Sequence, residues 1–266
     1  MKKLLALLLA LVMVLAMAAC AGKDAEETEA ATEAAAEEVV EEATEAATET
    51  PIEETKDAPT PDEEGAAVMT YADYAAAELE TPVVVECYVQ NHQSWWDNKV
   101  TVYAADADGA YFIYEMACSE EDAAKLIPGA KIRVSGFKGE WAGEVEIMEA
   151  TFEFVEGDSY IAEAIDATAL LGTEELINYQ NQLASFKGLT VEEISYKNDG
   201  GDDIYLTLSL NGTSYNFCVE VYLTGTDSDV YTTVGTLNVG DVVDVEGFLY
   251  WYEGVNPHIT AISLAA

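Results

Sequence analysis

The chain has little positive charge. Its 266 residues include 51 Asp and Glu against 11 Lys and Arg, and Arg133 is the sole arginine. Proteins that bind nucleic acid place basic residues opposite the phosphates. We therefore expect no nucleic-acid partner, and the same charge should repel anionic lipid and teichoic-acid surfaces.

Histidine is also scarce, with His92 and His258 the only two. Neither is accompanied by a Ser or Cys in a recognisable nucleophile motif, and two histidines with scattered cysteines do not make a zinc ligand set. We therefore predict no catalytic residues, no metal site and no cofactor, so the protein is not expected to be an enzyme. A hydrolase with paired carboxylates stays an alternative, because Asp and Glu occur throughout the chain.

Four cysteines are present: Cys20, Cys87, Cys118 and Cys218. Cys87 and Cys118 fall on or beside strands that a barrel could bring together, so a disulfide between them is one reading. Buried free thiols, which behave as small apolar side chains, are the other.

The N-terminus carries a targeting signal. Lys2 and Lys3 precede an apolar run, residues 4–19, that is short for a membrane span. The sequence Met17-Ala18-Ala19-Cys20 resembles the lipobox of bacterial lipoproteins. The resemblance implies a signal peptide over residues 1–19, a lipid on Cys20, and a location on the extracellular face of the bacterial cytoplasmic membrane. An ordinary secretory signal is the alternative.

Residues 20–66 lack aromatic side chains and are almost entirely Ala, Glu, Thr, Asp and Pro. Such a segment cannot bury enough apolar surface to offset the entropy lost on ordering. We expect a disordered acidic linker that begins at the lipidated Cys20.

The remaining 200 residues contain a repeat. GAKIRVSGFKGEWAG at 129–143 and GDVVDVEGFLYWYEG at 240–254 share Gly, Gly-Phe and Gly at the same spacing. Apolar residues alternate inside each copy, as in a strand with one buried face. We therefore predict one small β-domain used twice, over residues 67–156 and 157–266.

The strand order defines the expected fold. In the first copy we predict strands near 83–89, 100–104, 111–116, 131–137 and 144–154, with a helix between the third and fourth. This is the order of the OB-fold, a five-stranded Greek-key barrel. For the second copy we predict strands at 188–196, 204–210, 215–223, 242–250 and 259–264, a leading helix at 173–184, and only a loop at 224–239. The fold class is thus mainly β: two tandem OB-like barrels with short helices.

The stretch NHQSWWDNKVTVYAADADGAYFIYEMACSEEDAAKLIPGAKIRVSGFKGEWAGEVEI, together with GFLYWYEGVNPHIT, is similar to a type of secreted OB-like lipoprotein of Gram-positive bacteria. The resemblance spans about residues 70–266 and implies the architecture and the location. It implies no activity and no residue roles.

Aromatic residues mark the loops that flank the binding face of an OB barrel. Six of them form the predicted ligand-binding set: Trp95, Trp96, Trp141, Tyr250, Trp251 and Tyr252. Stacking on a sugar or anchoring a protein would suit these side chains. We expect a membrane-anchored binding protein for a neutral glycan or a protein partner. The alternative is a structural or assembly module in which the same rings pack between the barrels.

Three acidic turns could be read as calcium loops. They are residues 106–109 (DADG), 199–203 (DGGDD) and 227–229 (DSD). None continues into the full alternation of oxygen ligands ending in a bidentate Glu. We interpret them as turns and solvated loop charge.

Overall fold

The computed structural model describes residues 67–265. The predicted signal peptide, Cys20 and the acidic linker lie outside the described residues. Both barrels lie within one compact unit.

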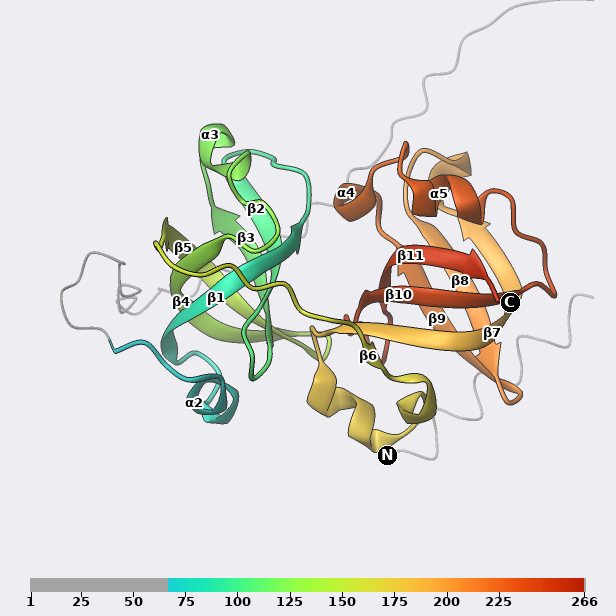
Figure 1. The fold of residues 1–266 in the computed structure, drawn as a ribbon, viewed down its shortest axis with the longest axis horizontal. Coiled ribbons are helices and arrows are strands. Elements are labelled where there is room, and N and C mark those ends of the chain that lie inside the picture. Colours follow the sequence, from blue (N-terminus) through green and yellow to red (C-terminus); the bar gives the residue numbers. More distant parts are fainter. Residues whose placement is uncertain (1–66, 266) are drawn as a thin grey trace, which may run out of the picture. The chain divides into compact units, whose positions relative to one another are not determined.

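The first barrel is closed by five strands (Figure 1): β1 (Pro82–His92), β2 (Lys99–Ala105), β3 (Ala110–Ala117), β4 (Lys131–Trp141) and β5 (Glu144–Phe154). The strand order around it is β1-β2-β3-β5-β4, with β4 returning to β1. The neighbours run antiparallel except for β3 and β5. This is the OB order that the sequence predicts.

The second barrel repeats the order. Its sheet comprises β6 (Ile165–Asp166), β7 (Leu183–Tyr196), β8 (Ile204–Leu210), β9 (Thr213–Val219), β10 (Val242–Phe248) and β11 (His258–Leu264). The order is β10-β11-β9-β8-β7-β6, and β10 also pairs with β7, which closes a ring of five. The parallel pair, β9 with β11, takes the place of β3 with β5. The prediction of two OB-like barrels is therefore confirmed.

Short helices occupy the connections. The α-helices are α2 (Tyr71–Ala76), α3 (Glu120–Ala123), α4 (Val221–Thr224) and α5 (Asp229–Val234), and the 3-10 helices are η1 (Thr168–Leu170), η2 (Glu174–Tyr179) and η3 (Lys197–Asp199). The predicted helix at 173–184 is wrong in type and length, because η2 ends at Tyr179 and β7 begins at Leu183. The predicted helix spans η2, the start of β7 and the turn at residues 180–182 that separates them.

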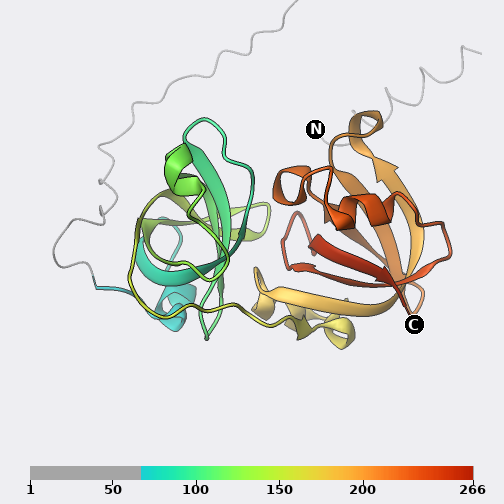
Figure 2. The ribbon, with the colours of Figure 1, turned by 45° about the horizontal axis from the view of Figure 1, so that its top comes forward.

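The predicted loop at 224–239 is also wrong, because it contains α5. The Ser228 hydroxyl accepts a hydrogen bond from the Tyr231 N–H and caps the helix. Val230 and Val234, four residues apart, are buried on the side that packs beside β11 (Figure 2). The Thr-Thr pair inside the helix masked it in the sequence, since β-branched residues are weak helix formers.

Glycine is required for the same structural reason at equivalent positions of the two repeats. Gly129 and Gly240 adopt φ values of +86° and +96° at the turn before the fourth strand of each barrel, a conformation that favours glycine. Gly136 and Gly247 lie at β-bulges where the neighbouring strand approaches closely. A Cβ on Gly136 would lie 2.6 Å from the Met148 carbonyl oxygen, and one on Gly247 would overlap the His258 backbone.

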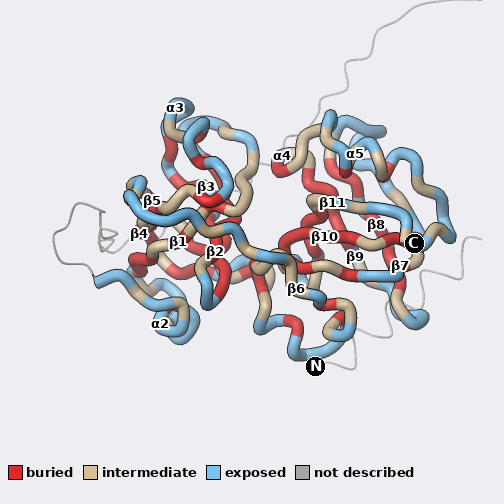
Figure 3. The backbone as a smooth tube through the Cα atoms, in the orientation of Figure 1, coloured by how far each residue is buried: buried red, intermediate tan, exposed pale blue. Residues whose placement is uncertain are grey.

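Each barrel has its own apolar core. Buried segments, shown in red in Figure 3, follow the strands, whereas α2, α3 and many connecting loops are exposed. Val85, Ile113 and Ile132 are among the core residues of the first barrel, and Phe186 and Phe217 of the second. The stability of each barrel thus comes mainly from its own interior.

Helix α2 is held to the first barrel by a buried lysine. The Lys138 ammonium donates hydrogen bonds to the carbonyl oxygens of Tyr74, Ala75 and Ala77, at 3.0, 2.8 and 2.9 Å. These carbonyls are at the C-terminal end of α2, where helix carbonyls lack the usual i+4 donors; the Tyr74 carbonyl also accepts from the Ala77 N–H at 3.2 Å. Burial lowers the pKa of Lys138, and the three acceptors compensate for the lost water.

A small apolar seam joins the two barrels. Tyr103 and Phe112 of the first barrel pack against Leu223 and Phe248 of the second. The rings of Tyr103 and Phe248 are stacked with centroids 4.3 Å apart. Leu223 lies in α4, so the seam also holds this short helix in place.

Candidate functional site

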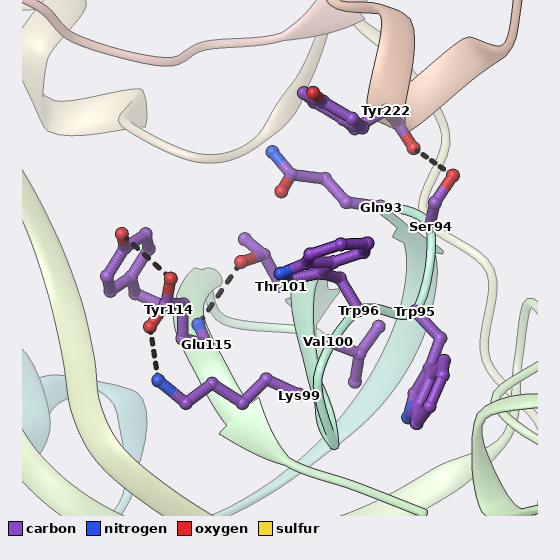
Figure 4. Close-up of a pocket in the computed structure, with 10 residues that line it drawn as sticks. All are labelled: Gln93, Ser94, Trp95, Trp96, Lys99, Val100, Thr101, Tyr114, Glu115 and Tyr222. Atoms are coloured by element: carbon purple, nitrogen blue, oxygen red, sulfur yellow. Dashed lines mark hydrogen bonds and ion pairs between the residues drawn. The ribbon is translucent and has the colours of Figure 1, made fainter. Parts of the chain in front are cut away.

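A cleft of about 380 Å³ opens where the loop between β1 and β2 meets helix α4. Both barrels contribute to its walls. The side chains shown in Figure 4 include the aromatic rings of Trp95, Trp96, Tyr114 and Tyr222, with Val100 at the base and Gln93 above it. Mostly apolar walls with a few polar groups are typical of small-molecule sites.

Trp96 is placed by a tight hairpin turn. Its backbone N–H and carbonyl pair with Lys99, at 3.0 and 2.9 Å. The two central residues, Asp97 and Asn98, have φ values of +47° and +60°. Positive φ at both positions defines a type I′ turn, the connection that best fits the twist of antiparallel strands. The Trp96 backbone is therefore rigid although its side chain is 81% exposed.

Trp95 and Trp96 project in different directions (Figure 4). The Trp95 indole N–H donates to the Cys118 carbonyl at 2.9 Å, and its ring packs against the core of the first barrel. Trp95 thus supports the loop, whereas Trp96 presents its ring to the cleft.

A β-bulge shapes the wall opposite Trp96. Between β2 and β3 the register shifts at Thr101, and Tyr114 and Glu115 form the extra length of β3. Glu115 has φ = +44°, and its N–H donates to the Thr101 hydroxyl at 3.1 Å. Bulges re-aim side chains and are frequent beside binding sites. Here the bulge leaves both Tyr114 and Glu115 lining the cleft.

The Glu115 carboxylate is paired with the Lys99 ammonium at 2.7 Å. The hydrogen bond from Lys99 is the main reason that the pKa of Glu115 is lowered. Both side chains are about half exposed. An ion pair with this much solvent contact contributes little to stability.

The second barrel supplies Tyr222 from α4. The Glu220 side chain accepts from the Tyr222 N–H and caps this short helix, and the Asp203 carboxylate accepts from the Val221 N–H. The Tyr222 carbonyl accepts from the Ser94 N–H at 2.7 Å. This last bond ties the wall of the second barrel directly to the loop that carries Trp96.

Trp141 and Tyr252, two other members of the predicted ligand-binding set, contact each other outside the cleft. Their ring centroids are 5.2 Å apart, and the Glu253 N–H donates to the Ala142 carbonyl beside them. Each ring is about half exposed. They bridge the β4–β5 turn of one barrel and the β10–β11 loop of the other.

Tyr250 and Trp251 are largely engaged inside the protein. Tyr250 stacks on His258 with ring centroids 4.3 Å apart and packs edge-on against Phe112. Trp251 packs against the core of the second barrel, and its backbone N–H donates to the Glu144 carboxylate at 2.8 Å. The structure therefore does not gather the six predicted aromatic residues into one site.

Carboxyl groups are buried beside the seam. Glu144 has no solvent-exposed surface, and one of its two oxygens has no hydrogen-bond partner in the described structure. Burial raises the pKa of Glu144 to about 8, and that of Glu146 and of Glu220 to about 7. Nearby His258 is fully buried, which lowers its pKa to about 4. In all four groups burial favours the uncharged form.

Tyr222 and Tyr114 were missed by the sequence reasoning. Tyr222 lies near the end of the predicted strand 215–223. In the structure β9 ends at Val219 and α4 begins at Val221, so Tyr222 is a helix residue. The only sequence signal was Glu220 followed by Gly225, an N-cap and a helix-ending glycine. Tyr114 lies in a predicted strand, and the alternation of apolar and polar residues along that strand does not reveal the bulge.

The turns and cysteines have plain structural roles. Asp106 accepts hydrogen bonds from the N–H groups of Asp108 and Gly109 and from the Tyr111 hydroxyl, so the DADG segment is a side-chain-closed turn. Over residues 67–265, no group of three or more His, Cys, Asp or Glu side chains is arranged to hold a metal ion.

Cys87 and Cys118 are buried free thiols, which decides between the two readings of that pair.

No family model matches the chain, and no curated protein matches it. Solved structures with a similar fold include a murine DNA-binding protein bound to double-stranded DNA, with 12% identity and a TM-score of 0.35 over 70% of this chain and 96% of that one. Another is the Ifi202 HINa domain in complex with a 20-bp double-stranded DNA, with 12% identity and a TM-score of 0.33 over 71% and 98%. A third is a deletion mutant of the single-stranded DNA-binding protein from Thermus aquaticus, with 12% identity and a TM-score of 0.25 over 70% and 94%.

These comparisons correct two predictions. We expected a neutral glycan or a protein as ligand and no nucleic-acid partner, but the matched proteins bind double- or single-stranded DNA. Both predictions are withdrawn. The net charge of the chain alone does not exclude a ligand class. At 12% identity and TM-scores of 0.35 or less, the likeness itself assigns no ligand to this chain.

Proposed function

We propose that this protein binds a small organic ligand in the cleft between Trp96 and Tyr222. The observation that carries the proposal is the placement of Trp96. Its ring is 81% exposed, yet it is mounted on a rigid turn over a cavity of about 380 Å³. Cavities of roughly 300–1,000 Å³ hold small ligands and cofactors.

An exposed tryptophan is a source of binding free energy. Removing a large apolar side chain from water contributes about 1.5–3 kcal/mol. Tyr222 is 61% exposed and Tyr114 is 44% exposed, so three rings around one cleft retain unburied apolar surface. A flat or compact apolar group that filled the cleft would cover all three.

The cleft is also preorganised. The type I′ turn fixes the Trp96 backbone, the bulge fixes Tyr114, and the Ser94–Tyr222 hydrogen bond fixes the opposite wall. Preorganised walls reduce the entropy lost on binding. The proposed ligand is a small molecule enclosed by both barrels, which differs from the polymer or protein surface first expected.

The test is ligand-detected NMR on the full chain with indole, benzyl alcohol, choline, glucose and a short oligo-dT strand as separate probes. We expect at least one of the three small apolar or ammonium probes to bind, and Trp96→Ala to abolish that binding. Trp141→Ala is the matched control, because Trp141 is also exposed but lies outside the cleft. Binding of oligo-dT or glucose alone, or equal loss in both variants, would overturn the proposal.

We further propose that the protein is a lipoprotein anchored through Cys20 on the outer face of the bacterial cytoplasmic membrane. The N-terminal signal pattern supports this. In the part of the chain that the structure describes, no helix is long and apolar enough to span a bilayer. Cys20→Ala should abolish labelling by a clickable fatty acid and release the protein from membranes. Retention of the label in Cys20→Ala would contradict the anchor.

A further inference from the structure

We propose that the cleft selects an organic cation of the methylated-ammonium class over uncharged ligands of the same shape. This inference deepens the proposed function and rests on it. It follows from three features of the cleft: the charge around it, the lack of a competing cation, and the rings and carboxylate that line it.

The charge of the folded region favours a cation. Residues 67–266 contain 34 acidic and seven basic residues, a net charge of −27. A low-dielectric cleft in such a protein concentrates positive ligands, and this effect weakens as salt is added.

No unpaired basic group lines the cleft within residues 67–265. Lys99 is the one basic residue at its wall, and its ammonium is already paired with Glu115 at 2.7 Å. A ligand cation would therefore not be repelled by a free ammonium.

The aromatic rings belong to the third feature. Trp96, Tyr114 and Tyr222 line one cavity, and their ring faces carry the negative part of the ring quadrupole. A cation within about 6 Å of such a face gains between about twofold and thirtyfold in affinity, most with tryptophan. Methylated ammonium groups suit this environment, because their methyl groups cover apolar surface while the charge stays diffuse.

Glu115 supplies a carboxylate at the wall. The bulge and its φ of +44° bring this side chain to the cleft, where an unbulged strand would alternate Tyr114 and Glu115 to opposite faces. Glu115 is 46% exposed and its partner Lys99 is 51% exposed. An ion pair this exposed is weak, so an incoming ammonium can share the carboxylate with Lys99.

The experiment compares choline with its uncharged isostere, 3,3-dimethyl-1-butanol, by calorimetric titration of the full chain at low and at physiological salt. We expect choline to bind at least about fivefold more tightly, in line with a cation–ring contact at a partly exposed site. Trp96→Leu should remove this preference. Glu115→Gln should weaken choline but not the isostere, and Lys99→Met should strengthen choline.

Two matched controls separate the site from the general field. Trp141→Leu and Glu175→Gln change an exposed tryptophan and an exposed carboxylate outside the cleft, and both should leave the preference unchanged. Choline binding that survives Trp96→Leu would show attraction by net charge alone and would overturn the inference.

The remaining outcomes distinguish the two proposals. Equal affinity for choline and the isostere, lost in Trp96→Leu, would overturn cation selection and leave the small-ligand site standing. The same holds if indole binds and neither titrant does. If wild-type protein with an intact thermal unfolding transition binds none of these small molecules, both proposals fail.

Discussion

The Tyr103 hydroxyl and the His258 Nδ1 are hydrogen-bonded at 2.9 Å across the two barrels, and both side chains are buried. Tyr103 lies on β2 and His258 is the first residue of β11. Because burial lowers the pKa of His258 to about 4, the imidazole is neutral at physiological pH. A neutral ring with its proton on Nε2 accepts a hydrogen bond from the Tyr103 hydroxyl at Nδ1.

Tyr103→Phe tests this link between the barrels. The substitution keeps the ring that stacks on Phe248 and removes only the hydroxyl, leaving a buried imidazole nitrogen without its partner. We expect the free energy of unfolding to fall by about 1–2 kcal/mol, measured by urea denaturation. Tyr205→Phe, which removes an exposed hydroxyl, is the control. Equal stability of Tyr103→Phe and wild type would contradict a structural role for the bond.

Glu144 should make stability depend on pH. Its pKa is about 8 in the folded protein and near 4.5 when unfolded, so between these values the folded state holds a proton that the unfolded state has released. Stability is therefore fully present below about pH 4.5 and declines as pH rises towards 8.

The measurement is urea denaturation from pH 5 to pH 9. Glu144→Gln, which cannot ionise, should flatten the decline over this range, and Glu175→Gln, at an exposed position, should leave it unchanged. Glu146 and Glu220 contribute in the same direction, so part of the slope should persist. An unchanged slope in Glu144→Gln would show that Glu144 is ionised when buried.

Gly247→Ala and Gly136→Ala should both be strongly destabilising. A Cβ at either position meets backbone atoms of the neighbouring strand, which cannot move without breaking the ladder. We expect a loss of at least about 2 kcal/mol in each case, read from thermal unfolding. Gly157→Ala serves as the control, because φ at Gly157 is not positive and the nearest atom to an added Cβ is the Lys131 Cδ at 3.5 Å, an ordinary van der Waals contact. Similar stability in all three variants would contradict the close-approach explanation of the repeat.

Lys138→Met should loosen helix α2. The methionine fills similar volume but leaves three carbonyl oxygens without the ammonium that they accept from. We expect a destabilisation of about 2–3 kcal/mol and faster limited proteolysis within residues 71–79. Lys187→Met, at an exposed lysine, should change neither. Protection of α2 in Lys138→Met would show that apolar packing alone holds the helix.

Much of the fold could be predicted from the sequence. Alternating apolar residues between glycines fixed strands such as β5 at Glu144–Phe154 and β8 at Ile204–Leu210, and the repeat indicated two copies. Those signals are local, because each strand buries one face of its own barrel. Helix α5 could not be predicted, because its only buried apolar residues are Val230 and Val234, which are too few to show a helical period in the sequence.

The candidate site could be predicted only in part. Trp95 and Trp96 were found because loop tryptophans are conspicuous, but the wall that faces Trp96 comes from Tyr222, in another barrel. The Ser94–Tyr222 hydrogen bond joins residues 128 positions apart in the chain. No periodicity or motif specifies such a contact, since it depends on how Tyr103 and Phe112 pack against Phe248. The same packing explains why Tyr250 turns inward, whereas Trp251 packs against the core of the second barrel.

The lysine that holds α2 also has a mechanical consequence. Residues 1–66 join the described chain just before α2, so tension transmitted along the backbone from that end reaches α2 and the Met69–Val84 backbone hydrogen bond first. Val84 lies on β1 and Lys138 lies on β4, so such a pull is shared between two strands of the first barrel. Lys138 thus provides a second attachment of this N-terminal segment, on a different strand from the first.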